Sequence, residues 1–295
     1  MTDRGPGSHS ALKGACHSGY LPSVSSYTPH FGEEPVLSGS RGTGNIFFSS
    51  CNLRCIFCQN YQISQDKHLA EESQVPFERL ADMMIELQSA GCHNIGLVSP
   101  SHFSAQILTS LTIAASKGLK LPVIYNSNGY DSVEMLKLYE GVADIYLPDL
   151  KYGDSAAGRS YSHVAHYFES AKSALLEMYR QVGSTVLYED GLMVRGLIVR
   201  HLVLPNGLAE SEEVFRFISR ELSPDIHISL MSQYYPAHRA SEEMLLSRKL
   251  RESEYQRTVE LLDKYGLKNG WIQEPESQDY YRPDFLSNRD NPFGN

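Results

Sequence analysis

Two periods of apolar residues alternate along the chain. Short runs that are apolar almost throughout are separated by longer stretches in which apolar residues recur every three or four positions. The first pattern is typical of buried strands and the second of amphipathic helices. The predicted strands are 45–49, 95–98, 122–125, 143–147, 197–204 and 226–230. The predicted helices are 77–87, 107–115, 133–139, 164–178, 214–222 and 255–262.

Regular alternation of strands and helices predicts parallel β-structure with crossover helices. The strands agree with this interpretation, because parallel strands are covered on both faces and carry few polar residues. Six strand–helix units predict an α/β fold with a curved sheet or an incomplete barrel, since a closed barrel needs eight. A doubly wound open sheet is the structural alternative, and the pattern alone does not separate the two.

The two ends of the chain lack these periods. Residues 1–35 are rich in Gly, Ser, His and Pro, and predict an N-terminal arm that is poorly ordered or wraps over the surface. Residues 36–275 contain all the predicted elements and predict one barrel domain, which ends shortly after a last apolar fragment, Trp271 and Ile272. Residues 276–295 are polar and predict a C-terminal tail.

Charge and composition bear on location and on partners. The chain has 295 residues and a formal net charge of −9, so its overall field repels nucleic acid and anionic membranes. Its first residues lack the apolar core of a secretory signal, and no apolar run approaches the length of a membrane span. We therefore expect a cytoplasmic protein that binds neither nucleic acid nor membranes.

The candidate chemistry lies in a cluster of cysteines. Of five cysteines, Cys51, Cys55 and Cys58 lie within eight residues, directly after the first predicted strand. An odd number of cysteines without a secretory signal argues against a disulfide framework. Spacings of three and two residues allow one tight loop to direct three sulfurs at a common centre, and thiolates are the usual ligands of iron–sulfur clusters. Three ligands on a cubane leave one iron open for a substrate or cofactor.

Three other interpretations of the cysteines are a structural zinc site, a redox dithiol and burial in the core. A structural zinc site needs four ligands, and the fourth would be His68, ten residues beyond the loop in a polar stretch. A redox dithiol formed by Cys55 and Cys58 leaves Cys51 without a role. Burial as small apolar side chains does not explain three cysteines within eight residues. Cys16 and Cys92 lie outside the loop, and Cys92 begins a strand, so we expect it to pack in the core.

The segment CNLRCIFC over residues 51–58 resembles the CxxxCxxC loop of the radical S-adenosylmethionine superfamily, including an aromatic residue, Phe57, before the last cysteine. The flanking segments, from HFGEEPVL at residue 30 to MSQYYPAHRA at residue 231, are similar to an uncharacterised group whose members are often labelled pyruvate formate-lyase activating enzymes. The resemblance covers residue 30 to the C-terminus. It implies a partial (β/α)6 TIM-like barrel of the radical S-adenosylmethionine type, with a [4Fe-4S] cluster and S-adenosylmethionine at the carboxyl ends of its strands.

The resemblance also implies contacts to the cofactor. Phe57 would lie beside the adenine, although it can equally anchor the loop in the core. Ser99 and Ser101 stand where the superfamily usually has a Gly-Gly-Glu edge that meets the cofactor's amino group. Asn126 begins an Asn-Ser-Asn-Gly segment where the activating enzymes have Asp-Thr-Asn-Gly, and its Asn128-Gly129 end is also ordinary turn chemistry.

After the fourth strand, Asp149 and Lys151 match an Asp-x-Lys pattern that faces the methionine carboxylate in the activating enzymes. Alternate residues on a strand share a face, so both side chains can reach one ligand. An ion pair at a strand end is the alternative interpretation. Gln233 after the sixth strand, and Arg200 and His201 on the fifth, are weaker candidates for cofactor binding, and His102 alone is more often a surface or capping residue than a catalyst.

The implied activity is reductive cleavage of S-adenosylmethionine to a 5′-deoxyadenosyl radical, which then takes a hydrogen atom from a substrate. Reduced flavodoxin or ferredoxin would supply the electron. Two substrate classes remain open, namely a glycine residue of a glycyl-radical enzyme, or another protein, peptide or small metabolite. A metal-stabilised binding module without catalytic activity is the third possibility, because fold-level resemblance does not fix function.

Overall fold

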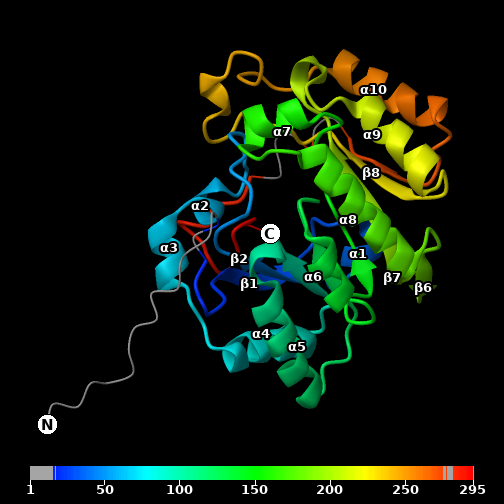
Figure 1. Ribbon diagram of the computed structural model, residues 1–295. Helices are drawn as coiled ribbons and strands as arrows, with labels where there is room; N and C mark the ends of the chain where they lie inside the picture. The colour runs from blue at the N-terminus through cyan, green and yellow to red at the C-terminus, as the bar shows by residue number, and fades with distance from the viewer. Residues whose placement is uncertain (1–15, 17, 275–276, 278–281, 295) are drawn as a thin grey trace, which may run out of the picture.

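The computed structural model describes residues 16, 18–274, 277 and 282–294 and contains one nine-stranded sheet. Its strand order is β1-β2-β3-β4-β5-β7-β8-β9, with β6 paired to β7 outside this path (Figure 1). The strands from β2 to β9 in this order are parallel, whereas β1 and β6 are antiparallel to their neighbours. The strands are β1 (Val24–His30), β2 (Thr43–Phe48), β3 (Ile95–Val98), β4 (Val123–Asn126), β5 (Ile145–Tyr146), β6 (Leu187–Glu189), β7 (Leu192–Leu202), β8 (His227–Met231) and β9 (Gly270–Ile272).

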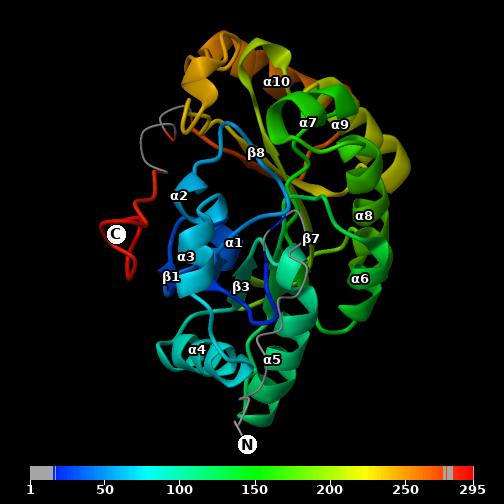
Figure 2. The same ribbon diagram turned by 60° about the vertical axis from the view of Figure 1, so that its left-hand side comes forward.

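Helices follow the strands and line the outside of the curved sheet (Figure 2). Six of them correspond to the predicted helices, namely α4 (Phe77–Ser89), α5 (Ser104–Ser116), α6 (Val133–Leu138), α8 (Tyr167–Val182), α9 (Ser211–Phe217), which continues as the π-helical turn η3 (Ile218–Leu222), and α10 (Glu252–Lys264). Shorter helices that the periodicity did not predict are α1 (Pro35–Ser38), α2 (Tyr61–Ser64), α3 (Lys67–Glu72), α7 (Ser155–Ser162), η1 (Ser101–Phe103), η2 (Pro205–Gly207) and η4 (Ala240–Glu242). None of the helices in the described part of the chain has the length and apolarity needed to cross a lipid bilayer.

The parallel strands follow one another across the sheet in the order in which they occur along the chain. A doubly wound sheet reverses its strand order at a switch point, and this sheet does not. The structure therefore excludes that alternative and confirms the predicted partial (β/α)6 TIM-like barrel, with β2, β3, β4, β5, β7 and β8 as its six strands.

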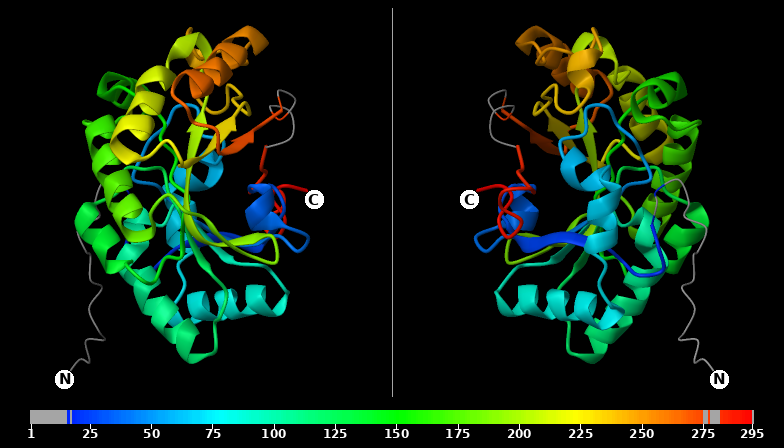
Figure 3. Two further views of the ribbon diagram at one scale, coloured as in Figure 1. Left: turned by 90° about the vertical axis from the view of Figure 1, so that its right-hand side faces the viewer. Right: turned by 90° about the vertical axis from the view of Figure 1, so that its left-hand side faces the viewer.

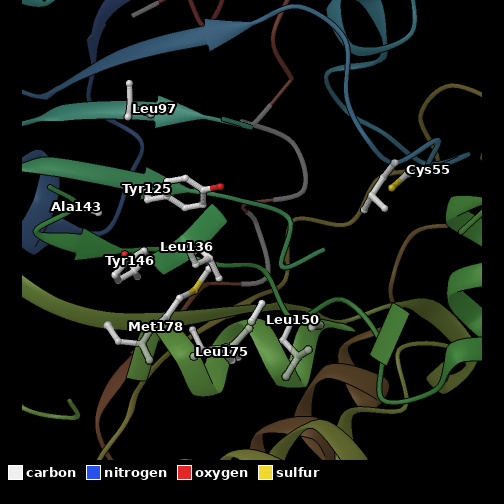
Figure 4. Close-up of a cluster of buried hydrophobic side chains, with 14 of the residues drawn as sticks. Cys55, Leu97, Tyr125, Leu136, Ala143, Tyr146, Leu150, Leu175 and Met178 are labelled. Atoms are coloured by element: carbon white, nitrogen blue, oxygen red, sulfur yellow. The ribbon is translucent and has the colours of Figure 1, made fainter. Parts of the chain in front are cut away.

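The two faces of the sheet bury different layers. Tyr125 and Tyr146 point outward, where the ring of Tyr125 lies 4.8 Å from that of Tyr139 at the end of α6. Figure 4 shows Tyr125 and Tyr146 with Leu136 of α6 and Met178 of α8, in the layer between sheet and helices. This layer forms the main apolar core.

On the inner face, Ile124, Ile145 and Ile198 form a smaller apolar cluster that is covered by Leu37 of α1. Side chains alternate between faces along a strand, so the next inward residues on β4 and β7 are Asn126 and Arg200. The barrel interior is therefore apolar near its base and polar toward the carboxyl ends of the strands.

The predicted N-terminal arm contains a strand. Residues 1–15 and 17 lie outside the described part of the chain, but Val24–His30 form β1 along the edge of β2. The strand assignment applies to Val24–His30, and the arm boundary at residue 35 stays a prediction. Ser25, Ser26 and Thr28 hide the strand from a search for apolar alternation, and Pro29 is tolerated because an edge strand leaves some backbone groups without ladder partners.

The predicted C-terminal tail also packs on the barrel. Residues 276, 278–281 and 295 lie outside the described part, but Phe285 is fully buried and its ring lies 5.3 Å from that of Phe47 in β2. The ring of Phe293 lies 4.2 Å from that of His30. Figure 3 shows this segment against the N-terminal elements at the open side of the barrel. The boundary predicted at residues 275–276 lies outside the described part of the chain.

Candidate functional site

A cavity of about 760 Å³ occupies the mouth of the barrel. Its walls come from the loop after β2, which carries the three clustered cysteines, and from residues at or just beyond the carboxyl ends of the other parallel strands. Residues 30–35, from the end of β1 to the start of α1, also line it. Ligands of α/β barrels bind at this end of the strands, so the cavity is the candidate site.

The cysteine loop is held in place by backbone hydrogen bonds to two distant segments. The N–H groups of Arg54 and Ile56 donate to the carbonyl oxygens of Ser162 and Tyr161 at the end of α7, at 3.0 and 2.9 Å. The N–H of Arg239, beyond β8, donates to the carbonyl oxygen of Ile56 at 2.9 Å. The fold therefore fixes the loop from both sides of the cavity.

All three clustered cysteines line the cavity, and each sulfur has a polar neighbour. These neighbours are Asn128 Nδ2 for Cys51 (3.4 Å), Ser162 Oγ for Cys55 (3.0 Å) and Ser64 Oγ for Cys58 (3.3 Å). The backbone N–H of Leu53 also donates to the sulfur of Cys51, at 3.4 Å. Hydrogen-bond donors around the sulfurs stabilise thiolate ligands and tune the metal that they bind.

Burial, together with the neighbouring Cys55, raises the pKa of Cys51 to about 11 and that of Cys58 to about 12. Burial also raises the pKa of Cys55, while Lys151 opposes the increase. The thiols therefore keep their protons unless a cationic group binds to them. Three sulfur donors that share one cavity, with free volume beside them, fit a cluster that keeps one iron open.

The other cysteines and the zinc interpretation can be placed as well. Cys92 is buried in the main core, as predicted, and Cys16 does not line the cavity. His68, the fourth ligand that zinc would need, is exposed on α3 and is also absent from the lining. Across the described residues, no group of three or more His, Cys, Asp or Glu side chains has the arrangement of a single-ion site.

A network of largely buried charges joins predicted residues of β4 and β7 with Asp149 and Lys151, which follow β5. Lys151 Nζ lies 2.6 Å from Asp149 Oδ2, and Arg200 Nε lies 2.9 Å from Asp149 Oδ1. Arg200 also donates to Asn126 Oδ1 at 2.6 Å and to Glu33 Oε2 at 3.1 Å. Arg200, a weaker candidate from the sequence, is thus the centre of the network.

This network fixes the charge of its members. Burial alone would raise the pKa of Asp149, but Arg200 and Lys151 outweigh burial and hold this pKa below its ordinary value. Burial lowers the pKa of Lys151, and Asp149 outweighs that effect and raises it. Asp149 and Lys151 therefore form the ion pair that the alternative interpretation predicted, while both still line the cavity.

Three further predicted residues, Phe57, Ser99 and Gln233, also line the cavity. The ring of Phe57 packs against those of Tyr234 and Tyr152, at 5.9 and 6.4 Å, so this side chain anchors the loop in the core. Ser99 has a φ of 58°, a left-handed backbone conformation that turns the chain sharply after β3.

Ser101 does not line the cavity. Its hydroxyl donates to Asp131 Oδ1 at 2.5 Å, and the same carboxylate accepts from Ser127 at 2.7 Å and from Tyr125 at 3.0 Å. Burial raises the pKa of Asp131, whereas these hydroxyls oppose the increase. The structure thus places Ser101 among the hydrogen bonds that support the cavity wall, not in the wall itself.

The two candidate histidines also lie outside the lining. His102 Nε2 lies 2.8 Å from the carbonyl oxygen of Ser49, beneath the cysteine loop. His201 follows Arg200 on β7, so its side chain points to the opposite face and packs against Phe215 of α9. His201 is fully buried in the core, whereas His102 is half-buried.

The sequence analysis missed two residues of the cavity, Glu33 and Glu34. They belong to the segment HFGEEP, which was quoted for its resemblance but was assigned to the arm. Glu33 is fixed by Arg200 and by Asn45 Nδ2, which donates to its Oε1 at 2.8 Å. The signal in the sequence was a pair of acidic residues before a proline, with no indication that the fold would bury them.

Comparison with known proteins gave no match to any family model. The chain is 34% identical over 245 residues to the uncharacterised protein MJ0674 of Methanocaldococcus jannaschii, which covers 81% of this chain. The chain spans 66% of the length of that relative.

Two solved structures resemble the fold. Methylornithine synthase (PylB) matches with a TM-score of 0.51 and 16% sequence identity, over 77% of this chain and 63% of that one. TYW1 with a bound lysine-pyruvate adduct matches with a TM-score of 0.48 and 15% identity, over 79% and 78% of the two chains. The likeness to PylB shows the fold alone, a partial α/β barrel.

Proposed function

We propose that this chain is a radical S-adenosylmethionine enzyme that holds a [4Fe-4S] cluster on Cys51, Cys55 and Cys58. The observation that carries the proposal is that three sulfurs of one loop, each with a polar neighbour, open into a 760 Å³ cavity at the carboxyl ends of the strands. When bound, the cluster and S-adenosylmethionine would supply reductive cleavage to a 5′-deoxyadenosyl radical that takes a hydrogen atom from the substrate.

The residues of the chain would position the cofactor and exclude water. Lys151, held by Asp149, presents a buried cation to the cavity and suits the methionine carboxylate. Asn126 is oriented by Arg200 and can meet the polar groups of the cofactor. The apolar layers on both faces of the sheet keep the radical chemistry dry. The electron would come from a small external redox protein, reduced flavodoxin or ferredoxin.

Anaerobic reconstitution tests the proposal. We expect a brown protein with about four iron and about four sulfide per chain, which forms 5′-deoxyadenosine from S-adenosylmethionine when reduced. Cys55→Ala should abolish both cluster assembly and cleavage. Cys92→Ala is the matched control, because it removes a buried thiol outside the loop and should keep both. Cleavage by the Cys55 variant, or a colourless protein with one saturated metal ion, would contradict the proposal.

The substrate class of the proposed enzyme is tested separately. Resemblance of the segments around residues 30 and 231 favours activation of a glycyl-radical enzyme, and modification of another protein, a peptide or a small metabolite is the alternative. The loaded enzyme, mixed with a pyruvate formate-lyase type protein, should generate a glycyl radical that electron paramagnetic resonance detects. Formation of 5′-deoxyadenosine without that signal would reject the subtype and leave the enzyme class intact.

A further inference from the structure

The carboxylate of Glu34 is buried in the cavity and only partly satisfied. The residue is 8% exposed, it lines the cavity, and its Oε2 has no hydrogen-bond partner. Burial raises the pKa of Glu34 and the neighbouring Glu33 adds to this, while Arg200 and the hydroxyl of Ser229 oppose it. An unpartnered buried carboxylate is costly, so its presence at a cavity wall needs a reason.

Among the described residues, neither lining cation forms a salt bridge with Glu34, and Arg200 acts on it only through its charge. The three donor nitrogens of Arg200 bind Asp149, Glu33 and Asn126, and Lys151 binds Asp149. Carboxylates outnumber cations among the described lining residues, with Glu33, Glu34, Asp149 and Glu274 against Lys151 and Arg200. The cavity can therefore accept a positive charge from a ligand.

Glu34 lies beside Ser229 of β8, which pairs in register with Arg200 of β7 and with Trp271 of β9. Three strands, β4, β5 and β7, separate β8 from β3, after which Ser99 follows. Glu34 and Trp271 therefore lie at the β8–β9 side of the cavity, away from the turn after β3.

We propose that Glu34 forms an ammonium subsite in the wall of the cavity and that the enzyme's substrate is a small molecule with a protonated nitrogen that binds there, which favours the small-metabolite alternative over a glycyl-radical enzyme. The nitrogen would donate a charge-assisted hydrogen bond to Oε2, and the face of Trp271 adds a cation–π contact. The assignment of this ligand as substrate rests on the proposed function, whereas the binding of the cation requires no cluster.

Trp271 is the single tryptophan of the chain and lines the same cavity, so its fluorescence reports occupancy. The full-length protein without cluster is titrated with n-pentylammonium and with its neutral isostere pentan-1-ol. We expect at least about tenfold tighter binding of the ammonium, and a loss of about tenfold or more in Glu34→Gln with the alcohol unaffected. Glu274→Gln, which removes the same charge at the exposed rim, should change the affinity less than about twofold.

Two results would overturn the subsite, namely equal ammonium affinity in Glu34→Gln, or no preference of the parent protein for ammonium over alcohol. The comparison of ammonium with alcohol uses the parent protein, so it tests the subsite even where Glu34→Gln fails to fold. In the reconstituted protein, dialysis with labelled n-pentylammonium shows whether it binds together with S-adenosylmethionine or is displaced by it. Simultaneous binding with S-adenosylmethionine supports a substrate site, whereas displacement assigns Glu34 to the cofactor's own amino group and overturns the substrate assignment.

Failure of the proposed function gives a different pattern. If the protein assembles no cluster but still binds the ammonium through Glu34, the proposed reaction is rejected and the subsite is retained. If the protein cleaves S-adenosylmethionine but Glu34 has no role in ammonium binding, the subsite is rejected and the proposed reaction is retained.

Discussion

Replacing His201 should change how the stability of the protein depends on pH. The imidazole is fully buried, with Nδ1 2.6 Å from the carbonyl oxygen of Leu150 and Nε2 2.8 Å from Ser211 Oγ. A neutral ring satisfies both contacts, because Nδ1–H donates to the carbonyl and Nε2 accepts from the hydroxyl. Burial lowers the pKa of His201 to about 4, from an ordinary value of 6.5.

The sign and size of the effect follow from that shift. Between pH 4 and 6.5 the unfolded chain binds one proton at this position that the folded chain excludes, so stability rises with pH in this window. As the pH falls from 6.5 to 4, the contribution lost approaches about 3 kcal/mol, at about 1.4 kcal/mol for each unit of pKa shift. At the middle of the window the slope is about 1.4 kcal/mol per pH unit.

Urea unfolding, followed by circular dichroism at intervals from pH 4.5 to 6.5, measures this slope. His201→Asn keeps a donor for Leu150 but cannot titrate. The slope of its unfolding free energy against pH should therefore be smaller than that of the parent by the equivalent of about one proton. Ser211→Ala is the control, because it removes the hydrogen bond to Nε2 and keeps the imidazole. It should lower the stability and leave the slope unchanged. An undiminished slope in His201→Asn would refute the reasoning.

Three other substitutions test the site and its frame. Lys151→Ala should weaken S-adenosylmethionine binding by roughly ten- to hundredfold in equilibrium dialysis while iron content stays near normal, and loss of the cluster would indicate a structural role. Arg200→Met leaves Asp149 without its main partner and should lower the unfolding free energy by about 3–5 kcal/mol in urea. Arg180→Met removes an exposed arginine that also binds two carboxylates, and an equal loss there would contradict the importance of burial. Phe285→Ala should cost about 3–5 kcal/mol in thermal unfolding, unless only its own segment detaches.

The fold was largely predictable because its elements are long and periodic. The run Ile95–Val98 is apolar on both faces, and helix α4 carries Leu80, Met84 and Leu87 on one side. Strand β1 was missed because an edge strand needs few apolar residues, and Ser25 and Ser26 are buried by neighbours that a local pattern does not reveal. The burial of Phe285 depends on β2, more than 200 residues earlier.

The site was predictable where chemistry is local in sequence. The spacing of Cys51, Cys55 and Cys58 is visible directly, and the structure places all three in one cavity. The role of Arg200 was underestimated because its partners come from three distant segments. Nothing near Glu34 in the sequence indicates that its side chain turns into the barrel.

Asp131 links the turn after β3 to the turn after β4, because its carboxylate accepts hydrogen bonds from Ser101 and Ser127. Asn128 follows Ser127, and its amide donates to the sulfur of Cys51. Removing the Ser101 hydroxyl in Ser101→Ala should therefore alter the surroundings of a sulfur that Ser101 does not contact, and in a protein that holds the proposed cluster this would change the spectrum of the cluster.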